Sequence, residues 1–398
     1  MYWQSGSGGD SLLIREFINV SLTNYKRVIN KIKILFTIPN FDTAGSGKAM
    51  LKLAQRLNPD VFEPHICSGR DKGDFIQTVK DSGIPFYIFQ FQHSFGNKFN
   101  GLRLSWQKRK FFKQFDLVHS FNYIDDYSEA LSARLAGTKW IFVKKNMGWG
   151  GNSWKVRSRL AHGIIAQNTD MMKQFYPGNK KVRLIPRGVD TTEFKPRPPA
   201  EKLLQEFGLT PKNKIVLAVA NLVSVKGIEV LIDAFAANSE KLPESVLMIV
   251  GDNRGEYGDQ LIANANAKGL NNRIIFTGKR KDIRDFQSIA NCFVLPTLNK
   301  GRQEGSPVAL LEALASGTPS LASNVSGIRD QLTDITDQLF EAGNSDELAE
   351  KLNWFLTMTE DEREAIITKQ LEVLNQRYTL EHEVALHEAF YLKVIGRK

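Results

Sequence analysis

KIKILFTIPNFDTAGSGKAMLKLAQRL, residues 31–57, contains the pattern that indicates the fold class of this chain. Residues 31–39 are mostly apolar and β-branched, as in a buried strand, and residues 49–57 place apolar side chains at helical spacing. A glycine-rich turn between them would present backbone N–H groups at a helix N-terminus, where an anion is stabilised. The stretch therefore predicts a strand, a turn suited to phosphate and a helix.

This turn is not the phosphate loop of a nucleoside triphosphatase. Such a loop has glycine five residues before its Gly-Lys pair, and Asp42 stands there in this chain. It also has serine or threonine after the lysine to bind magnesium, where this chain has Ala49. A triphosphatase is therefore rejected.

Strand-like runs alternate with amphipathic helical runs along most of the chain, in two series separated by the proline-dense segment 195–200. The strand-like runs are 31–38, 62–68, 85–91, 115–121, 140–145, 163–168 and 182–189, followed by 214–221, 246–252, 273–278, 292–297 and 319–324. Apolar strands interleaved with helices form parallel sheets that are covered on both faces. The pattern predicts an α/β protein of two doubly wound, Rossmann-like domains, with a ligand cleft between them at the carboxyl ends of the strands.

The expected domain boundaries follow from these two series. We expect a flexible lead-in or extra helix at 1–30, an N-terminal Rossmann-like domain at 31–190, a C-terminal Rossmann-like domain at 191–375, and a helix at 376–398 that returns to the N-terminal domain. The beginning of the chain lacks the basic-then-apolar order of a signal peptide, and no apolar run approaches the roughly 18 residues that span a bilayer. The two cysteines lie in apolar runs and favour buried, reduced thiols. A cytoplasmic protein is expected.

Charge is distributed unevenly along the chain. Residues 1–190 hold 29 Lys and Arg against 14 Asp and Glu, a net charge of +15, whereas the remainder holds 24 against 29, a net charge of −5. A basic N-terminal half indicates an anionic partner there: a phosphorylated substrate, nucleic acid or an acidic membrane.

The segment QEGSPVALLEALASGTP, residues 303–319, carries most of the chemical information. Ser306 is suited to an N-cap and Pro307 to the first helical position, and Gly317 ends a helix of about ten residues. The helix interior is apolar except for Glu312, and a carboxylate in an apolar run costs several kcal/mol unless it is paired. Glu312 either forms a salt bridge, lies on an exposed helix face, or accepts hydrogen bonds from a ligand diol.

Glu304 stands eight residues before Glu312, and the N–H groups of 306–308 lie between them. One carboxylate at a ribose, amides at a phosphate and a second carboxylate at a sugar describe a nucleotide-sugar site.

The spacing Glu-x7-Glu followed by Ala-x-x-Ser-Gly-x-Pro resembles the donor motif of retaining GT-B glycosyltransferases, specifically glycosyltransferase family four. Further segments resemble this family in the family's order; they are 184–196, 221–235, 250–253 and 276–278. The resemblance runs from about residue 31 to the C-terminus and implies a GT-B fold of two Rossmann-like domains that face each other across a cleft. It further implies that the N-terminal domain, 31–190, binds the acceptor and that the C-terminal domain, 191–375, binds the nucleotide sugar.

The resemblance also implies roles for individual residues. Glu304 would contact hydroxyls of the donor sugar, Glu312 the ribose diol, and Lys226 the pyrophosphate that leaves, although an isolated Lys226 would be an ordinary solvated turn lysine. Arg280 lies where the family's backbone holds the base. The remaining donor-side positions are Gly45, Gly47, Asn221, Gly305, Ser306, Pro307 and Val308. Lysine and helix amides stabilise the phosphate charge, so neither a metal nor a cofactor is expected.

Two positions depart from the family pattern. Asn221 stands where the family usually has arginine, and Asn146 where it usually has histidine, so one positive charge is missing and Asn146 can only hydrogen-bond a sugar hydroxyl. Lys48 is a candidate for the missing charge and, with Ser46, an acceptor-side candidate. His119, at a strand end, either orients the substrate or completes the core.

The segment 97–115 interleaves basic and aromatic residues at helical spacing. It suits an interfacial helix on an anionic membrane, and an ordinary amphipathic helix explains it equally well. Nucleic acid is not expected, because no recognised nucleic-acid module accompanies the segment.

These observations predict a retaining, metal-independent glycosyltransferase that moves a sugar from a UDP- or GDP-linked donor to a glycan or lipid-linked acceptor in cell-surface polysaccharide or lipopolysaccharide assembly. The enzyme would work in the cytoplasm or on the inner face of the cytoplasmic membrane. The alternatives are a catalytically weak nucleotide-sugar-binding protein and a nucleotide-sugar epimerase of GT-B fold.

Overall fold

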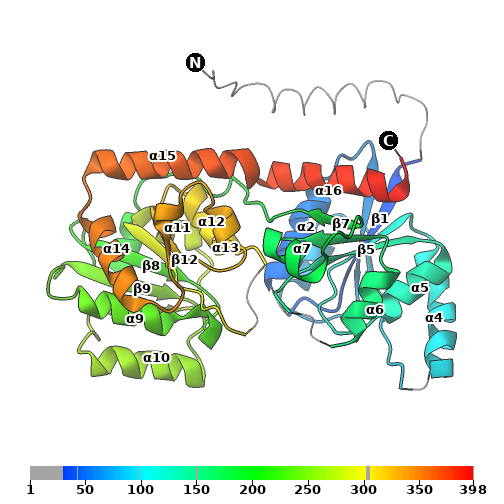
Figure 1. The fold of residues 1–398 in the computed structure, drawn as a ribbon, viewed down its shortest axis with the longest axis horizontal. Coiled ribbons are helices and arrows are strands. Elements are labelled where there is room, and N and C mark those ends of the chain that lie inside the picture. The colour runs from blue at the N-terminus through cyan, green and yellow to red at the C-terminus, as the bar shows by residue number, and fades with distance from the viewer. Residues whose placement is uncertain (1–29, 43, 97, 149–150, 302–304, 398) are drawn as a thin grey trace, which may run out of the picture.

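A computed structural model gives the structure of the protein and describes residues 30–397, apart from 43, 97, 149–150 and 302–304. The described residues form two parallel β-sheets with helices packed around them (Figure 1). Alternate side chains of one strand enter different core clusters: Ile34 and Phe36 lie in one cluster and Leu35 in another. Ile215 and Val216 divide in the same way in the second sheet. Both faces of each sheet are therefore buried, and the predicted α/β class is confirmed.

In the described part of the chain, the first sheet has seven strands. They are β1 (Ile32–Ile38), β2 (Phe62–Ser68), β3 (Phe86–Ile88), β4 (Leu117–Ser120), β5 (Lys139–Lys144), β6 (Gly163–Ala166) and β7 (Val182–Leu184). Their order is β3-β2-β1-β4-β5-β6-β7, so β1 lies inside the sheet between β2 and β4. The helices of this domain are α2 (Ala44–Arg56), α3 (Ile76–Lys80), α4 (Lys98–Phe112), α5 (Ser128–Ala136), α6 (Ser153–Leu160) and α7 (Thr169–Phe175).

The second sheet has six strands among the described residues, in the order β10-β9-β8-β11-β12-β13. They are β8 (Lys214–Val219), β9 (Ser245–Val250), β10 (Ile274–Gly278), β11 (Cys292–Leu295), β12 (Ser320–Ser323) and β13 (Leu339–Phe340). The helical elements are α8 (Glu201–Glu206), η1 (Ser224–Lys226), α9 (Ile228–Ala237), α10 (Glu256–Ala267), α11 (Ile283–Ile289), α12 (Val308–Ala315), α13 (Ile328–Gln331), η2 (Thr336–Gln338) and α14 (Ser345–Thr357). Each predicted strand-like run contains a strand, and the sequence pattern missed only β13, whose two residues are too few to show a period.

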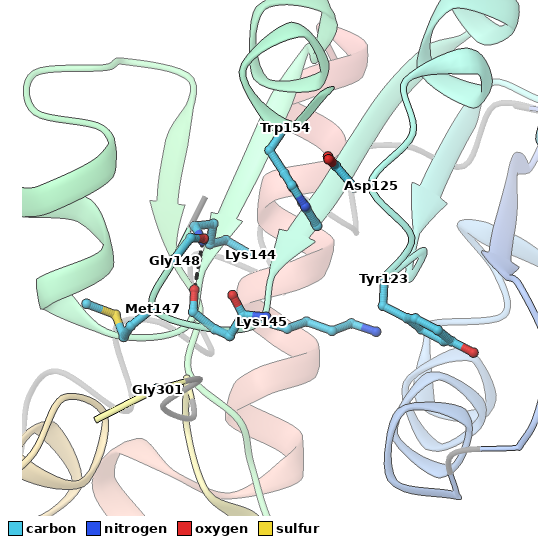
Figure 2. Close-up of a pocket in the computed structure, with 9 residues that line it drawn as sticks. Tyr123, Asp125, Lys144, Lys145, Met147, Gly148, Trp154 and Gly301 are labelled. Atoms are coloured by element: carbon cyan, nitrogen blue, oxygen red, sulfur yellow. Dashed lines mark hydrogen bonds between the residues drawn. The ribbon is translucent and has the colours of Figure 1, made fainter. Parts of the chain in front are cut away.

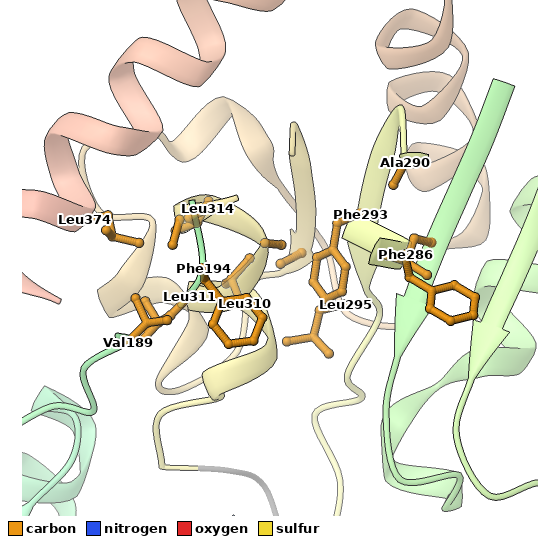
Figure 3. Packing of buried hydrophobic residues seen from close by; sticks show 14 of the residues in the cluster. Val189, Phe194, Phe286, Ala290, Phe293, Leu295, Leu310, Leu311, Leu314 and Leu374 are labelled. Carbon is orange, nitrogen blue, oxygen red and sulfur yellow. The ribbon is translucent and has the colours of Figure 1, made fainter. Parts of the chain in front are cut away.

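The apolar face of α12 anchors the core of the second domain. Leu310, Leu311 and Leu314 belong to one buried cluster with Phe293 and Leu295 of β11 (Figure 3). Burial of three leucines stabilises the fold by about 1.5–3 kcal/mol for each side chain. The position of α12, and of the segment that leads into it, is thereby fixed to the sheet.

Two long helices at the end of the chain follow each other and lead from the second domain back to the first (Figure 1). The first, α15 (Glu360–Arg377), starts with a capping box between Thr359 and Glu362 and packs beside α12. The second, α16 (Leu380–Ile395), contributes Phe390 and Tyr391 to the core cluster of β1. The last helix of the chain is thus part of the N-terminal core.

Two helix boundaries differ from the prediction. Helix α2 starts at Ala44 rather than near residue 49, so Gly45 and Gly47 lie in its first turn instead of in a loop. A Cβ atom on Gly47 would lie 2.8 Å from the ring of Phe41, which shows that this glycine is needed for packing. Helix α12 starts at Val308 and has eight residues, not about ten.

The predicted N-cap of α12 is also wrong. Pro307 occupies the N-cap position, and no side chain caps the helix. The Ser306 hydroxyl is used elsewhere, because it accepts hydrogen bonds from Arg187 N at 3.3 Å and from Gln331 Nε2 at 3.0 Å.

The two cysteines, Cys67 and Cys292, are buried free thiols, as predicted, and burial raises the pKa of both. Within the described ranges, no helix combines the length and apolar character needed to cross a membrane.

Candidate active site between the two sheets

The segment that follows β11 meets the N-terminal domain at Gly305. The carbonyl oxygen of Gly305 accepts a hydrogen bond from Asn168 Nδ2 at 2.8 Å. A Cβ atom on Gly305 would lie 2.7 Å from Gln167 Oε1 and 2.9 Å from the carbonyl oxygen of Lys145. A side chain would therefore push the two domains apart, so glycine permits the close approach. Glu304, predicted to bind the donor sugar, lies outside the described residues, directly before this contact.

The loop that carries Lys226 packs against the loop that follows β11 in the second domain. It ends η1 and is 7% exposed. The following Gly227 has a φ of +62°, and its Cβ would lie 2.2 Å from the carbonyl oxygen of Pro296, just after β11. Leu298 N donates to the carbonyl oxygen of Val225 at 2.8 Å. The loop that carries Lys226 is thus locked to the loop that leads to Glu304.

Glu312, on α12, faces charged groups of the N-terminal domain and the connection between the domains. Burial raises its pKa to about 7; Lys52 lowers this pKa, Glu193 raises it and Lys48 lowers it. Lys52 Nζ pairs with Glu193 Oε2 at 2.5 Å. The carboxylate is therefore ionised only above neutral pH, where it can accept hydrogen bonds from a diol.

Three predicted donor-side positions have distinct surroundings. Asn221 is exposed on the loop after β8. The Arg280 guanidinium pairs with Glu206 at 2.5 Å and with Asp282 at 2.6 Å, so its side chain is occupied by α8 and by the start of α11. Lys48 is exposed on α2, and its charge acts on Glu312.

A cavity of about 380 Å³ opens at the carboxyl ends of β4 and β5 (Figure 2). It is lined by Tyr123, Asp125, Lys144, Lys145, Asn146, Met147, Gly148, Trp154 and Gly301. Gly301 belongs to the second domain, and the other lining residues belong to the first. The cavity brings the predicted Asn146 together with two aromatic rings, a carboxylate and two lysines that the sequence reasoning did not single out.

Lys145 is the most unusual of these residues. Its ammonium donates to Phe121 O at 2.7 Å and to Ser46 Oγ at 3.1 Å, and it lies 5.9 Å from the centroid of the Tyr123 ring. Figure 2 shows the side chain extended from the end of β5 toward Tyr123. Burial, and the charges of Arg187 and Arg157, lower its pKa to about 7. Ser46 is thus a hydrogen-bond acceptor for this lysine, and its acceptor-side role stays a prediction.

Lys144 shapes the loop that carries Asn146. Its Nζ donates to the carbonyl oxygen of Asn146 at 2.7 Å and to that of Gly148. It also lies 4.3 Å from the centroid of the Phe175 ring, and burial lowers its pKa to about 8. These contacts fix the backbone of Asn146 at the cavity wall.

A buried polar network lies next to one wall of the cavity. The Glu129 carboxylate accepts a hydrogen bond from Thr37 Oγ1 at 2.5 Å, and burial raises the pKa of Glu129 while Arg157 lowers it. Arg157 Nη1 donates to the carbonyl oxygen of Ile124 at 3.0 Å. Because Ile124 follows Tyr123 directly, this network holds one cavity wall.

The structure places His119 in the core and not in the cleft. The residue is 0% exposed, and its Nδ1 lies 2.7 Å from the Tyr391 hydroxyl oxygen of α16. Burial, and the charges of His387, Lys145 and Arg187, lower its pKa well below the ordinary value. The acceptor-side role is therefore corrected: His119 completes the core.

In the part of the chain that the structure describes, no three His, Cys, Asp or Glu side chains form a group that could hold a metal ion. Metal independence of the reaction stays a prediction.

Two family descriptions match the chain. Residues 43–193 match Glycosyltransferase Family 4, and residues 200–372 match Glycosyl transferases group 1. The first range falls in the domain of β1–β7 and the second in the domain of β8–β13.

Curated relatives match over part of their length. The UDP-Gal:alpha-D-GlcNAc-diphosphoundecaprenol alpha-1,3-galactosyltransferase of Escherichia coli is 29% identical over 236 residues, which are 54% of this chain and 59% of that protein. The mannosylfructose-phosphate synthase of Agrobacterium fabrum is 32% identical over 159 residues, 37% of this chain and 34% of the relative. The matched segments span less than two thirds of either relative.

Solved structures share the complete fold. A glycosyltransferase from Rickettsia africae has a TM-score of 0.81 at 19% identity, with 93% of this chain and 100% of that chain covered. Anabaena HepE in complex with UDP and glucose has a TM-score of 0.75 at 21% identity, with 91% and 99% covered. Since both family descriptions match in chain order and the two-domain fold is that of solved glycosyltransferases, the chain belongs to glycosyltransferase family 4 and has the GT-B fold.

Proposed function

We propose that the protein is a retaining, metal-independent glycosyltransferase that moves a sugar from a UDP- or GDP-linked donor to a glycan or lipid-linked acceptor. One observation carries the proposal: the segment at Gly305, which follows Glu304, contacts Lys145 at the wall of the cavity. A donor bound by the second domain would thus present its sugar to an acceptor in the first. The Escherichia coli relative is named for transfer from UDP-Gal to a diphosphoundecaprenol-linked acceptor, which supports a role in cell-surface polysaccharide or lipopolysaccharide assembly.

The reaction needs charge stabilisation at the leaving diphosphate and orientation of two sugars. In this proposal, Lys226 stabilises the diphosphate, Glu304 binds hydroxyls of the transferred sugar and Glu312 binds the ribose diol. The bond between the sugar and the diphosphate breaks while a bond to the acceptor oxygen forms on the same face. A diphosphate oxygen takes the acceptor's proton, so Asn146 needs only to hydrogen-bond a sugar hydroxyl.

Thermal stabilisation by a panel of nucleotide sugars tests donor binding, because a ligand that binds only the folded state raises its stability. Donor hydrolysis and transfer are then measured with the donor that stabilises most. Glu304→Ala should lower turnover by at least about 100-fold, as expected for loss of a group that acts in the transition state. Equal turnover in Glu304→Ala would refute the site assignment.

The same panel of nucleotide sugars distinguishes the transferase from the two alternative functions. These alternatives arise because Asn221 and Asn146 depart from the family pattern. A protein that binds UDP or GDP but neither hydrolyses nor transfers any sugar is a nucleotide-sugar-binding protein. Interconversion of the donor into its epimer would identify an epimerase.

We further propose that α4 rests on an anionic membrane surface. Phe99, Leu102 and Trp106 are 86%, 51% and 54% exposed, and their spacing of three and four residues places them on one face of the helix. Arg109 covers the Trp106 ring at 3.4 Å, and Arg103 is exposed beside Leu102. Exposed aromatic residues flanked by cations are typical of a helix that lies in a lipid interface.

Flotation with vesicles that contain anionic phospholipid tests this surface. Binding at low salt that weakens at high salt is expected, and Leu102→Ser with Trp106→Ser should weaken it further. Absence of binding at low salt would rule out the membrane role and leave the transferase proposal unaffected. Such a surface would locate the protein on the inner face of the cytoplasmic membrane.

A further inference from the structure

The leaving diphosphate carries more negative charge than Lys226 neutralises. Asn221 is neutral at the position where the family usually has a second cation, and the Arg280 side chain is already paired with two carboxylates. A second cation would therefore have to come from the opposite wall of the cleft.

We propose that the ammonium of Lys145, from the N-terminal domain, is the second cationic contact of the donor diphosphate. The inference rests on the proposed function, because it takes the ligand to be a nucleoside diphosphate sugar. It assigns a substrate contact to a residue that lies one position before Asn146.

The position of Lys145 supports this contact. Its backbone carbonyl faces Gly305, the residue after the expected sugar-binding carboxylate, and its ammonium reaches Ser46 in the first turn of α2. The residue thus lies between the two segments that the sequence predicts at the phosphate, which the structure shows as the first turn of α2 and the segment that leads into α12. It also lines the cavity, so its surface is accessible from the cleft.

The electrostatic surroundings of Lys145 favour an anion. Among the described residues it makes no ion pair with a carboxylate; its ammonium donates to a carbonyl and a hydroxyl. The cations that act on it are Arg187, after β7, and Arg157, on α6. Asp125 and Lys144 line the same cavity, and Lys144 donates to backbone carbonyls. The positive charge of Arg157 is offset by the nearby Glu129 carboxylate. A half-buried cation without an anionic partner is costly, and a bound diphosphate would remove that cost.

Proton uptake is the measurable consequence. With a pKa of about 7, Lys145 is mostly neutral at pH 8 in the free protein. A diphosphate oxygen beside it favours the charged form, so binding would draw a proton from the buffer. At pH 8, Glu312 is already ionised and does not contribute a comparable uptake.

The other lysines of the region fit the role less well. Lys144 is bound to the carbonyl oxygens of Asn146 and Gly148, and Lys48 is exposed beside Glu312. The earlier candidate for the missing charge, Lys48, is therefore replaced by Lys145 in this proposal.

Titration calorimetry of UDP and GDP at pH 8 tests the proposal, with two buffers that differ in ionisation enthalpy. The wild-type protein should take up most of a proton for each nucleotide bound. Lys145→Met should bind about 10- to 100-fold more weakly, the loss expected for a hydrogen bond to a charged group, and should take up clearly less. Lys145→Arg should keep most of the affinity without the proton uptake, because arginine does not titrate near pH 8.

Lys139→Met is the matched control, because Lys139 lies at the opposite end of the same strand, β5. It should bind nucleotide and take up protons like the wild type. Circular dichroism and thermal melting establish that each variant is folded, and Lys145→Gln replaces Lys145→Met if the latter is not.

The outcomes separate this inference from the proposed function. If no nucleoside diphosphate binds the wild type, the proposed function fails. If UDP or GDP binds and Lys145→Met has the wild-type affinity and proton uptake, the Lys145 inference is overturned and the transferase proposal stands. The inference is likewise overturned if Lys145→Met leaves nucleotide binding intact and raises only the KM for the acceptor.

Discussion

Asn168 joins the two domains through a hydrogen bond from its side-chain amide to the carbonyl oxygen of Gly305, 2.8 Å away. The Oδ1 atom of the same side chain accepts from Met171 N at 2.7 Å and caps α7. Asn168 is 0% exposed, so water cannot replace either bond. One buried side chain therefore couples the start of a helix in the first domain to the segment that follows Glu304 in the second.

The two bonds of Asn168 can be separated by substitution. Asn168→Ala removes both and should lower the free energy of unfolding by about 1–3 kcal/mol, from loss of the cap and of a buried hydrogen bond. Asn168→Ser keeps an oxygen acceptor for Met171 as an N-cap and is too short to reach Gly305. We therefore expect Asn168→Ser to be more stable than Asn168→Ala and to bind the donor more weakly than the wild type.

Thermal melting and nucleotide-sugar binding of both variants provide the check. Donor affinity that is unchanged in Asn168→Ser would mean that this contact only holds the domains together and does not position the segment around Gly305.

Gly305→Ala should disturb the site through packing alone. The new Cβ would meet the Lys145 carbonyl oxygen at 2.9 Å, a backbone atom that cannot rotate away. The segment around Gly305 must shift, so we expect at least about a tenfold loss of donor affinity, which corresponds to roughly 1.4 kcal/mol. Gly96→Ala is the control, since its Cβ would have no described neighbour closer than 3.7 Å. Equal donor affinity in Gly305→Ala would contradict this prediction and show that the close approach at Gly305 is not needed for donor binding.

The sequence predicted the strands well, because they depend on local patterns, whereas the roles in the donor motif stay predictions. Buried strands of a parallel sheet are mostly apolar runs, and Glu312 stands out as the one carboxylate in the apolar helical segment 308–315. The start of α2 was predicted too late because Gly45 and Gly47 have low helix propensity. At Gly47 a side chain would collide with the ring of Phe41, which lies outside the helix, so packing requires a glycine there in spite of its low helix propensity.

The role of Lys145 could not be read from the sequence. A Lys-Lys pair at a strand end has the pattern of a solvated surface, and only the fold brings Ser46 and Phe121, 99 and 24 residues away, to the Lys145 ammonium. His119 shows the reverse case. Its place at a strand end suggested the cleft, and the return of α16 covers it with Tyr391.

Donor affinity should depend on pH through Glu312. Burial raises the pKa of Glu312 to about 7, so the carboxylate is ionised above pH 7 and protonated below it. Only the ionised form accepts two hydrogen bonds from a diol. In the Lys145→Arg background, where residue 145 does not take up a proton, we expect the affinity for UDP or GDP to fall as the pH is lowered from 8 to 6, and to fall less when Glu312→Gln is added.

Glu312 should also affect stability, with a pH dependence opposite to its effect on donor affinity. The folded state of Glu312 binds a proton between the ordinary carboxyl pKa and about 7, so its contribution to stability is present at low pH and is lost as the pH rises through 7. Glu312→Gln should therefore raise the melting temperature at pH 8 more than at pH 5. Parallel pH profiles of binding for Lys145→Arg with and without Glu312→Gln would contradict a role of Glu312 at the ribose.

Acid should destabilise the N-terminal domain through His119 and His387. Burial lowers the pKa of both imidazoles in the folded protein, although Glu383 partly opposes this at His387. In the unfolded chain, histidine titrates near pH 6.5, so below that pH the unfolded state binds more protons and the free energy of unfolding falls. The double variant His119→Leu with Tyr391→Phe removes one titrating ring and both partners of their hydrogen bond. Its melting temperature should therefore fall less than that of the wild type between pH 7 and pH 5.

Phe390→Leu, in the same core but without a titrating group, is the control for this experiment. It should melt at a lower temperature at every pH, with the slope of the wild type. A wild-type slope in the double variant as well would mean that other groups cause the acid sensitivity. Because His119 lies in the core and does not reach the cavity, the double variant should keep its turnover at pH 8, whereas a loss of turnover without a loss of stability would return His119 to the acceptor side.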